Sequence, residues 1–359
     1  MVKNNRNIDM KFIPLKPSLA QQWDYVAQNS DDAWLFHLYD WLPLTEQHWN
    51  LESKSFLLEY EGKVIGIFPL QLNRKSKSLK STYMGLGGAA LLNGLQEGVR
   101  KKALKAMYEQ VYLIASECQS PFIEILLNPL SESALNDRWQ INPLVSYFYE
   151  DTSSHTWMLD LSISEDEILN NYSDDTRRMI RKASLKNYKI EQLTKISEID
   201  NIYEIHCENR ERTKVPVHPK DFFFDFYSHI CAKNLAVIWK AVDSNGRLVA
   251  FEVTGLFKKG ALYWMGSSNN DCLEDGVNYL LQHHAIMWAK QQGLQWFENG
   301  EAFPNIQEGK MHGLTVFKGK FGGHLHRLFK GKITMNHPGR IKHMVRISSN
   351  FYNAFIRRR

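Results

Sequence analysis

The sequence predicts two mixed α/β domains in tandem, each with a twisted sheet flanked by helices. The first observation is length, because 359 residues suffice for two units of about 100–200 residues, each able to bury its own core. The second is a repeated order of elements, in which hairpin, strand, polar or glycine-rich loop, helix and strand occur once in each half. The repeat indicates a structural duplication, although such elements are common enough to align by chance.

The first half begins this order at residues 55–70, SFLLEYEGKVIGIFPL. Its apolar runs flank Glu61-Gly62 and predict a hairpin. STYMGLGGAALLNG follows as a strand that enters a glycine-rich loop. Residues 100–118 then carry apolar side chains at helical spacing, and PFIEILLNP is the next strand. We therefore expect a first domain over residues 1–150.

The second half repeats the order around a DSNG turn. LAVIWKAV and RLVAFEVTGLF flank this turn, and ALYWMGSS leads through a Ser/Asn loop to the helix YLLQHHAIMWAKQQG and the strand LQWFENGE. Unpaired N–H groups converge where a strand opens into a loop before a helix, and they hold anions or polarised carbonyls there. We expect residues 151–335 to form a second domain with the main site, followed by a basic tail over 336–359.

Composition gives no sign of membrane spans, disulfides or a metal centre. Hydrophobic residues make up 43% of the chain, but no apolar stretch approaches the roughly 18–20 residues of a spanning helix. The N-terminus lacks the apolar core of a signal peptide. The four cysteines have neither CxxC nor CxxH spacing. We therefore expect a cytoplasmic protein without a metal cofactor.

The net charge of +5 is unevenly distributed. Basic residues gather in three places: residues 177–189, residues 318–332 and the tail. Such clusters suit a phosphate-bearing partner, namely a nucleotide sugar, a lipid pyrophosphate, RNA or an anionic membrane face. The alternative is a solvated face with a loose tail. In the first cluster a helix capped at Ser173 or Asp174 would place Arg177 and Arg181 on one face, where both can hold one phosphate.

Four segments resemble the Fem peptidyltransferases and their FemAB-like acyltransferase relatives in order and spacing. They are DDTRRMIRKASLKNYKI, GALYWMGSSNND, YLLQHHAIMWAKQQGLQWFENGE and VFKGKFGG. The resemblance covers about residues 150–332 well and residues 50–130 more loosely. It implies two tandem GNAT-like domains of the α/β class with mixed sheets, and acyl or aminoacyl transfer to an amine of a sugar or peptide.

The same resemblance implies roles for particular residues. Arg177, Arg178 and Arg181 look like the family's grip on the acceptor phosphate, while Tyr263 and Lys318 look like its cleft residues. Ordinary GNAT enzymes hold coenzyme A with an Arg/Gln-x-x-Gly-x-Gly/Ala loop. This chain has SSNND there instead, in which Asn269 is a candidate substrate contact, and Fem-like families also lack that loop. The donor therefore stays open between acyl-CoA, aminoacyl-tRNA and a protein-bound acyl group.

Acyl transfer to an amine needs a base and a stabilised oxyanion. Glu252 is the first candidate base, because a carboxylate inside the apolar run LVAFEVTGL would have a raised pKa; strand alternation could instead point it to solvent. Glu298 and Glu301 end an expected parallel strand, where sites form in open sheets. Either could be the base or bind the acceptor ammonium, or simply hold a loop. His283 is a further candidate, whereas His284 fits an apolar core stripe.

These observations lead to an N-acyltransferase of cell-envelope or surface-polysaccharide biosynthesis as the expected function. Its partner would be an amine-bearing sugar or peptide acceptor linked to phosphate. Contact with the inner membrane face through the basic tail is a further expectation. The alternative is a non-catalytic module on the GNAT scaffold that binds nucleic acid or anionic membrane through its basic face. A buried Glu252 facing a tunnel favours the enzyme, and a closed cleft favours the module.

Overall fold

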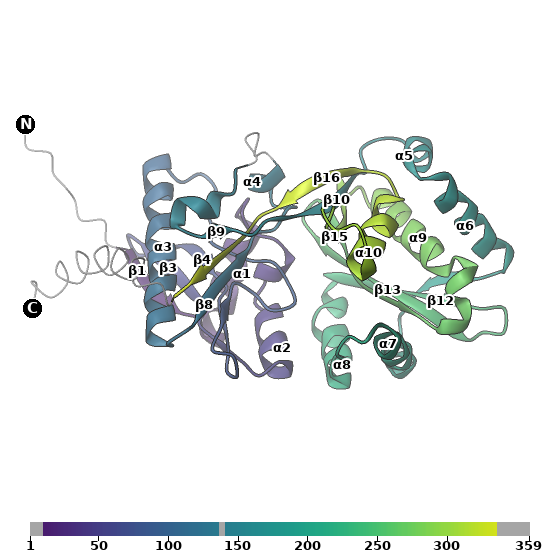
Figure 1. Cartoon of the computed structure of the whole chain (residues 1–359). Helices are drawn as coiled ribbons and strands as arrows, with labels where there is room; N and C mark the ends of the chain where they lie inside the picture. Colours follow the sequence, from purple (N-terminus) through teal and green to yellow (C-terminus); the bar gives the residue numbers. More distant parts are fainter. Residues whose placement is uncertain (1–9, 136–140, 336–359) are drawn as a thin grey trace, which may run out of the picture. The chain divides into compact units, whose positions relative to one another are not determined.

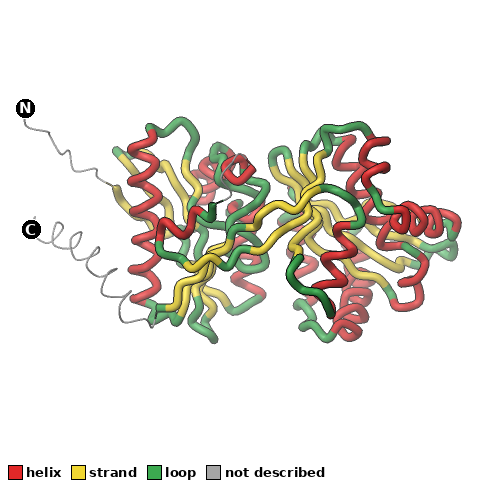
Figure 2. Tube along the Cα trace, turned by 45° about the horizontal axis from the view of Figure 1, so that its top comes forward, coloured by secondary structure: helices red, strands yellow, loops and turns green. Residues whose placement is uncertain are grey.

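The computed structural model describes residues 10–135 and 141–335, which form two compact units. Unit 1 comprises the described residues 10–135, 141–153 and 329–335, and unit 2 spans Ser154–Leu328. Each unit combines mixed sheets with helices (Figures 1 and 2). The expected α/β class with mixed sheets in two tandem domains is thus confirmed. The expected basic tail lies outside the described residues.

Unit 1 contains two sheets and a long helix. Its strands are β1 (Met10–Pro14), β2 (Leu51–Ser53), β3 (Phe56–Tyr60), β4 (Lys63–Phe68), β5 (Gln71–Asn73), β6 (Leu79–Lys80), β7 (Ala90–Leu91), β8 (Phe122–Leu126), β9 (Glu150–Asp151) and β17 (Lys330–Thr334). Its helices are α1 (Ala20–Gln28), α2 (Trp41–His48), α3 (Glu97–Glu117) and α4 (Glu132–Leu135). The strand orders are β1-β3-β4-β7 and β2-β5-β6-β8-β17-β9.

The local elements of unit 1 follow the sequence closely. The hairpin of β3 and β4 turns at Glu61 (φ 49°) and Gly62 (φ 76°), two positive angles that a tight hairpin turn requires. The helix expected over residues 100–118 is α3, whose Met107 and Val111 are fully buried. The strand β17 arrives from the far end of the chain and pairs antiparallel with β8 and β9.

Unit 2 is built on one seven-stranded sheet in the order β11-β12-β13-β14-β15-β10-β16. Its strands are β10 (Ser154–Asp160), β11 (Lys189–Gln192), β12 (Ala236–Val242), β13 (Leu248–Phe257), β14 (Gly260–Ser268), β15 (Trp296–Ala302) and β16 (His324–Leu328). Its helices are α5 (Glu165–Asn171), α6 (Asp174–Leu185), α7 (Ile199–Thr213), α8 (Lys220–His229), α9 (Val277–Gln291) and α10 (Gly309–Gly319). All neighbouring strands are antiparallel except β14 and β15.

Helices cover both faces of this sheet. Figure 1 shows α5, α6 and α9 on one side, and α7 and α8 on the other. The apolar stripe of α9 lies against β12, β13 and β14, with Val277, Leu281 and Ala285 at most 1% exposed. His284 packs at the edge of this stripe with its ring 4.6 Å from the Trp239 ring, as expected for a core histidine.

A glycine allows α6 and α9 to pack closely. Gly276 precedes α9 with φ +85°, and a Cβ there would lie 2.5 Å from the backbone oxygen of Met179 in α6. We expect Gly276→Ala to lower the free energy of unfolding by about 2–5 kcal/mol, because a left-handed conformation and an overpacked contact both cost energy. The control is Gly246→Ala, with φ +81° but nothing within 4 Å, which should cost only about 1–2 kcal/mol. Equal losses in urea titrations would contradict the packing argument.

Candidate active site

The sheet of unit 2 divides where its two parallel strands meet. β14 and β15 pair only at Gly260, Ala261 and Leu262, the last of which lies opposite Glu298. Beyond these pairs both strands continue without pairing each other, and we call this region the β14–β15 divergence. Backbone groups on its inner edges are available to a ligand, because a strand edge carries unpaired N–H and C=O groups. Sites in open sheets form at such carboxyl ends of parallel strands.

Glu298 is placed at the start of the divergence. Its side chain is inside the protein, and the residue is 2% exposed. Oε1 accepts a hydrogen bond of 2.8 Å from Thr156 Oγ1 on β10, while Oε2 is buried without a partner. Burial raises the pKa of Glu298 to about 7, and the Thr156 hydrogen bond and the charge of Lys318 oppose this shift. At neutral pH the carboxyl group is therefore close to half ionised and has an oxygen free to take a proton.

Lys318 reaches into the divergence from the last turn of α10. Its Nζ donates a 2.9 Å hydrogen bond to the carbonyl of Glu301. A Cβ at Gly300 would lie 2.7 Å from this Nζ and 3.6 Å from the carbonyl oxygen of Tyr263, so the ammonium lies between β14 and β15. Burial lowers the pKa of Lys318 to about 8, against the charges of Glu298 and Glu301. The amine is thus charged at neutral pH but loses its proton readily.

Two hydrogen bonds fix the surroundings of this pair. Asn299 Nδ2 donates to the carbonyl of Lys318 at 2.9 Å, which ties the end of α10 to β15. Asn299 Oδ1 is buried without a partner. Ser154 Oγ donates to Glu301 Oε1 at 2.6 Å, so this carboxylate is held by β10. The structure therefore brings together Glu298, Glu301 and Lys318 from the expected site residues.

Glu252 and Tyr263 lie beside each other on the face of the sheet covered by α9. Glu252 is paired with Trp239 and Gly266, is 2% exposed and has Oε1 without a partner. The alternative that strand alternation points it to solvent is therefore wrong. Burial raises the Glu252 pKa well above its usual value. The Tyr263 hydroxyl lies 2.7 Å from where a Cβ of Gly266 would be, and burial, then the charge of Glu252, raise its pKa.

Two further candidates lie at other places in unit 2. His283 belongs to α9, and its Nδ1 lies 3.4 Å from the Tyr172 hydroxyl. The two rings meet edge to face. Burial lowers the His283 pKa, which favours the neutral ring. Asn269 follows β14 directly, and its N–H donates to the carbonyl of Val249 at 2.9 Å. Asn269 therefore lies at the carboxyl end of β14, whereas His283 belongs to the helix layer.

The three arginines of α6 have different environments. Arg177 donates to the carbonyls of Leu169, Asn170 and Tyr172 and pairs with Asp174, so it closes the end of α5. Arg178 is 69% exposed and pairs with Asp175 at 2.5 Å. Arg181 is exposed, and its Nε donates to the Arg177 carbonyl of its own helix at 3.4 Å. A joint grip of the three on the acceptor phosphate stays a prediction.

Arg210 is a site candidate that the sequence analysis missed. It lies on α7 with Nη2 3.4 Å from His218 Nε2, and its Nε is buried without a partner. Within the described ranges, no carboxylate forms an ion pair with it. Burial lowers the Arg210 pKa, and its charge acts on Tyr263. Nothing in the run HCENRERTK distinguishes this arginine from Arg212, because only the fold places it near Tyr263.

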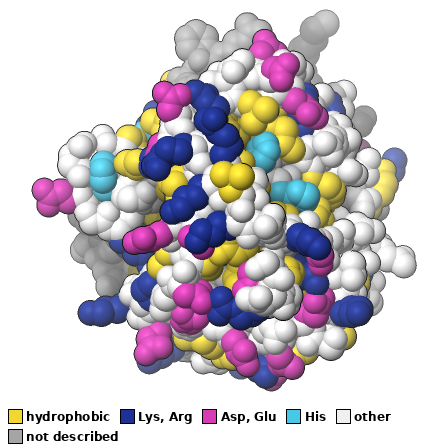
Figure 3. All heavy atoms as spheres, turned by 90° about the vertical axis from the view of Figure 1, so that its right-hand side faces the viewer, with side chains coloured by type: hydrophobic (Ala, Val, Ile, Leu, Met, Phe, Trp, Pro, Cys, Tyr) yellow, Lys and Arg dark blue, Asp and Glu magenta, His cyan; other side chains and the backbone are white. Residues whose placement is uncertain are grey.

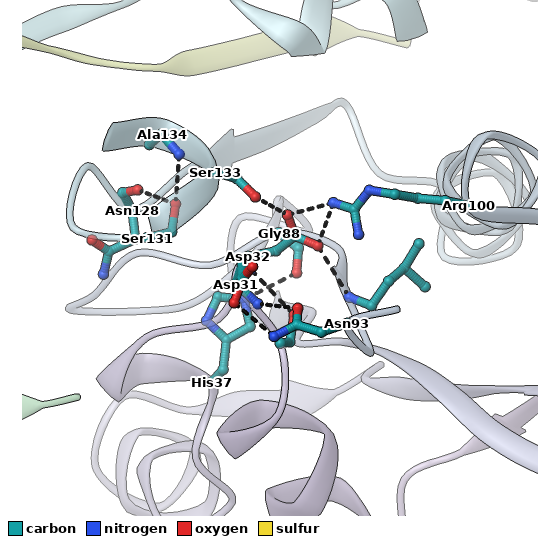
Figure 4. Close-up of polar contacts among 12 residues, drawn as sticks. Asp31, Asp32, His37, Gly88, Asn93, Arg100, Asn128, Ser131, Ser133 and Ala134 are labelled. Carbon is teal, nitrogen blue, oxygen red and sulfur yellow. Dashed lines mark hydrogen bonds and ion pairs between the residues drawn. The ribbon is translucent and has the colours of Figure 1, made fainter. Parts of the chain in front are cut away.

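Unit 1 has a polar cluster of a different kind. Asp32 accepts two hydrogen bonds from Arg100 at 2.6 and 2.7 Å and one from Ser133 at 2.6 Å; Figure 4 shows these groups pointing toward one another. A cavity of about 260 Å³ lies beside it, lined in part by Asp31 and Asn93, which also bond each other. Both oxygens of Asp32 are engaged in linking α3 to the loops. This cluster therefore stabilises the unit and offers no free base.

Burial of Glu298 has a measurable consequence for stability. Its pKa is about 7 in the folded protein against 4.5 in an ordinary environment, so folding favours the protonated form. Ionising the buried carboxyl group lowers the free energy of unfolding. This loss is absent below pH 4.5, grows as the pH rises to 7, and is then constant at roughly 3 kcal/mol. We expect Glu298→Gln to raise the free energy of unfolding progressively between pH 4.5 and 7. The gain is reduced by the favourable charge interaction with Lys318 that the variant loses. Denaturation curves would contradict this if the stability difference between Glu298→Gln and the wild type were the same at pH 5 and pH 8.

Within the described residues, no group of three or more His, Cys, Asp or Glu side chains is arranged to hold a metal ion. A second search of these same residues found no helix that is both long and apolar enough to cross a bilayer.

Part of unit 2 is similar to a known protein family. Residues 170–305 match the model of the acetyltransferase (GNAT) domain family, a segment that contains Glu252, Tyr263 and Glu298. A search of curated protein sequences found no match. The matched segment includes both strands of the β14–β15 divergence, whereas Thr156 and Lys318 lie outside it.

Solved structures extend the similarity to the whole fold. FemX is similar at 14% identity with a TM-score of 0.66, over 91% of this chain and 98% of FemX. A tandem GNAT protein from the clavulanic acid biosynthesis pathway is similar at 10% identity and a TM-score of 0.55, over 90% of this chain and 98% of its own. L-PGS from Bacillus licheniformis is similar at 12% identity and 0.51, over 78% and 85%. The chain thus has a fold similar to those of FemX and of a tandem GNAT protein, and residues 170–305 in its second unit match the GNAT acetyltransferase domain model.

Proposed function

We propose that unit 2 is an N-acyltransferase that moves an acyl or aminoacyl group to an amine of a sugar or peptide acceptor. The observation that carries this proposal is the pair of Glu298 and Lys318 at the β14–β15 divergence. One has a free buried oxygen and a pKa of about 7, and the other has a pKa of about 8. Groups whose pKa values lie near the working pH can both take and give protons during a reaction.

In the proposed reaction Glu298 transfers the proton and Lys318 stabilises the negative charge. The acceptor amine attacks the acyl carbon, and Oε2 of Glu298 takes the proton that the nitrogen loses. The carbonyl oxygen becomes negatively charged, and the ammonium of Lys318 stabilises it by a charge-assisted hydrogen bond. The intermediate then breaks the bond to the donor, and Glu298 returns its proton to the departing thiolate or alkoxide. The proton balance closes without a metal.

The acceptor would be held by Arg210, whose charge acts on Tyr263. Arg210 is half-buried, has an unpartnered Nε and lacks a carboxylate partner among the described residues, which suits a phosphate on the acceptor. Arg178 and Arg181 remain candidates for the same role. FemX and L-PGS are similar in fold, and a sugar or peptide acceptor from cell-envelope or surface-polysaccharide biosynthesis is the acceptor class that we propose on this basis.

Glu252 and His283 are the competing candidates for the base. Glu252 is as deeply buried as Glu298 and has an unpartnered oxygen, but it lies under α9 and not at the divergence. His283 is directed at Tyr172. We therefore favour Glu298, and the roles of Glu252 and His283 stay predictions.

A ligand screen tests the proposed function. Thermal denaturation would be followed with acetyl-CoA, longer acyl-CoAs, aminoacyl-tRNA and UDP-linked amino sugars, and each donor–acceptor pair that raises the melting temperature would be incubated and analysed by mass spectrometry. We expect an amide product whose mass equals the acceptor plus one acyl group. Binding of nucleic acid or anionic vesicles without any acyl product from any pair would favour the non-catalytic module.

A further inference from the structure

The outward face of α6 combines cations with the most exposed large hydrophobic side chain in the described part of the chain. Leu185 is 83% exposed. Arg178, Arg181 and Lys182 precede it by seven, four and three positions and are all exposed, so the four share one side of the helix. We call these four residues the α6 face. In Figure 3 several Lys and Arg side chains lie close to hydrophobic side chains on the face that is shown, and Asp and Glu side chains lie among them.

The opposite side of α6 anchors the helix to the protein. Thr176 and Ala183 are fully buried, and the Ser173 hydroxyl accepts a hydrogen bond from the Thr176 N–H at the start of the helix. Lys320 after α10 pairs with Asp175 at 2.7 Å. The helix is therefore held firmly, and the exposure of Leu185 is a property of a fixed surface.

The charges around the α6 face leave a positive excess. Asp174 pairs with Arg177, Asp175 with Arg178 and Lys320, and Asp275 with Lys186 at 2.8 Å. Arg181 has no carboxylate partner within the parts of the chain that the structure describes. Lys182 donates instead to the backbone carbonyl of Glu274 at 2.7 Å. The three aspartates are thus already paired. Among the described residues Arg181 and Lys182 have no carboxylate partner, whereas Arg178 would exchange Asp175 for a phosphate.

We propose that the α6 face docks on an anionic phospholipid bilayer. A bilayer surface offers phosphate groups to Arg178, Arg181 and Lys182, and directly beneath them an apolar layer for Leu185. Nucleic acid offers phosphates as well, but it gives a leucine no partner, and the α6 face has no aromatic side chain on which a base could stack. The combination therefore fits a membrane surface better than RNA or DNA.

This inference uses no residue of the β14–β15 divergence, but it assigns Arg178 and Arg181 to lipid phosphates instead of a phosphate on the acceptor. It gives unit 2 a peripheral membrane contact through α6. This contact is separate from the one that the sequence analysis expects for the basic tail. An enzyme attached in this way would meet acceptors presented at the bilayer surface.

Co-sedimentation of the full chain with vesicles tests the proposal. Vesicles of phosphatidylcholine would be compared with vesicles that also contain phosphatidylglycerol. We expect binding only to the anionic vesicles. Each cation near an anionic surface contributes about fivefold in affinity, so Arg178→Glu with Arg181→Glu should weaken binding about 25-fold or more. Leu185→Ser should weaken it about tenfold or more, and this loss should change little with salt concentration.

The matched control is Lys101→Glu with Lys105→Glu on α3 of unit 1, two side chains that are 75% and 65% exposed. It makes the same change in net charge and keeps the tail, and it should retain most of the binding. Equal losses in both double variants would overturn the proposal, because binding would then follow net charge alone. Tight binding of transfer RNA together with no binding to phosphatidylglycerol vesicles would also overturn it.

Discussion

Glu298→Gln is expected to lower turnover by about 10²–10⁴-fold, the usual contribution of a general base. The amide keeps the shape of the side chain and its hydrogen bond from Thr156, but it cannot take a proton. Because the carboxyl pKa is about 7, the wild-type rate should rise as the pH increases through 7, and this acid limb should vanish in the variant. The measurement is the pH dependence of kcat/KM with the donor–acceptor pair found by the screen.

Thr156→Val provides a graded test of the same assignment. The Thr156 hydrogen bond lowers the Glu298 pKa, so its removal should move the acid limb to higher pH without abolishing turnover. If the acid limb of the pH–rate profile stays near pH 7 in both Glu298→Gln and Thr156→Val, a group other than Glu298 causes it.

Lys318→Met is expected to lower kcat by about 10²–10³-fold, as when a donor to a developing oxyanion is removed. Methionine keeps most of the length of the side chain but has no charge. Since the Lys318 pKa is about 8, the wild-type rate should fall as the pH rises above 8. That basic limb should be lost in the variant.

Lys320→Met is the matched control for Lys318. It removes a lysine two positions further on, which pairs with Asp175 at the surface of α6 and not with the divergence. We expect a kcat close to that of the wild type. If Lys320→Met lowered kcat as much as Lys318→Met, the overall positive charge of this region would matter for turnover, and the position of the Lys318 ammonium would not.

Local signals predicted much of the fold. The Asp243–Gly246 turn forms with Gly246 at φ +81°, and Ser173 caps α6 as expected. Side-chain chemistry within a few residues determines these features, so they can be read from sequence. The sequence leaves the burial of Glu252 open, because strand alternation could also point a carboxylate in an apolar run to solvent.

The arrangement of the site could not be predicted in the same way. The bond from Thr156 to Glu298 joins residues 142 positions apart, because β10 pairs with β15 in the sheet. The return of residues 330–334 to unit 1 likewise depends on pairing with distant strands. Arg210 approaches Tyr263 only through the packing of α7 on the sheet. No local pattern marks any of these contacts.

The central claim is that Glu298, at the β14–β15 divergence, is the base for acyl transfer. The most direct test compares Glu298→Gln with Glu252→Gln, two conservative changes of equally buried carboxyl groups, by quantifying the acylated acceptor by mass spectrometry. The account predicts a loss of about 10²-fold or more for Glu298→Gln and near-normal product for Glu252→Gln. Normal product from Glu298→Gln, with the loss in Glu252→Gln, would contradict the account and assign the base to Glu252.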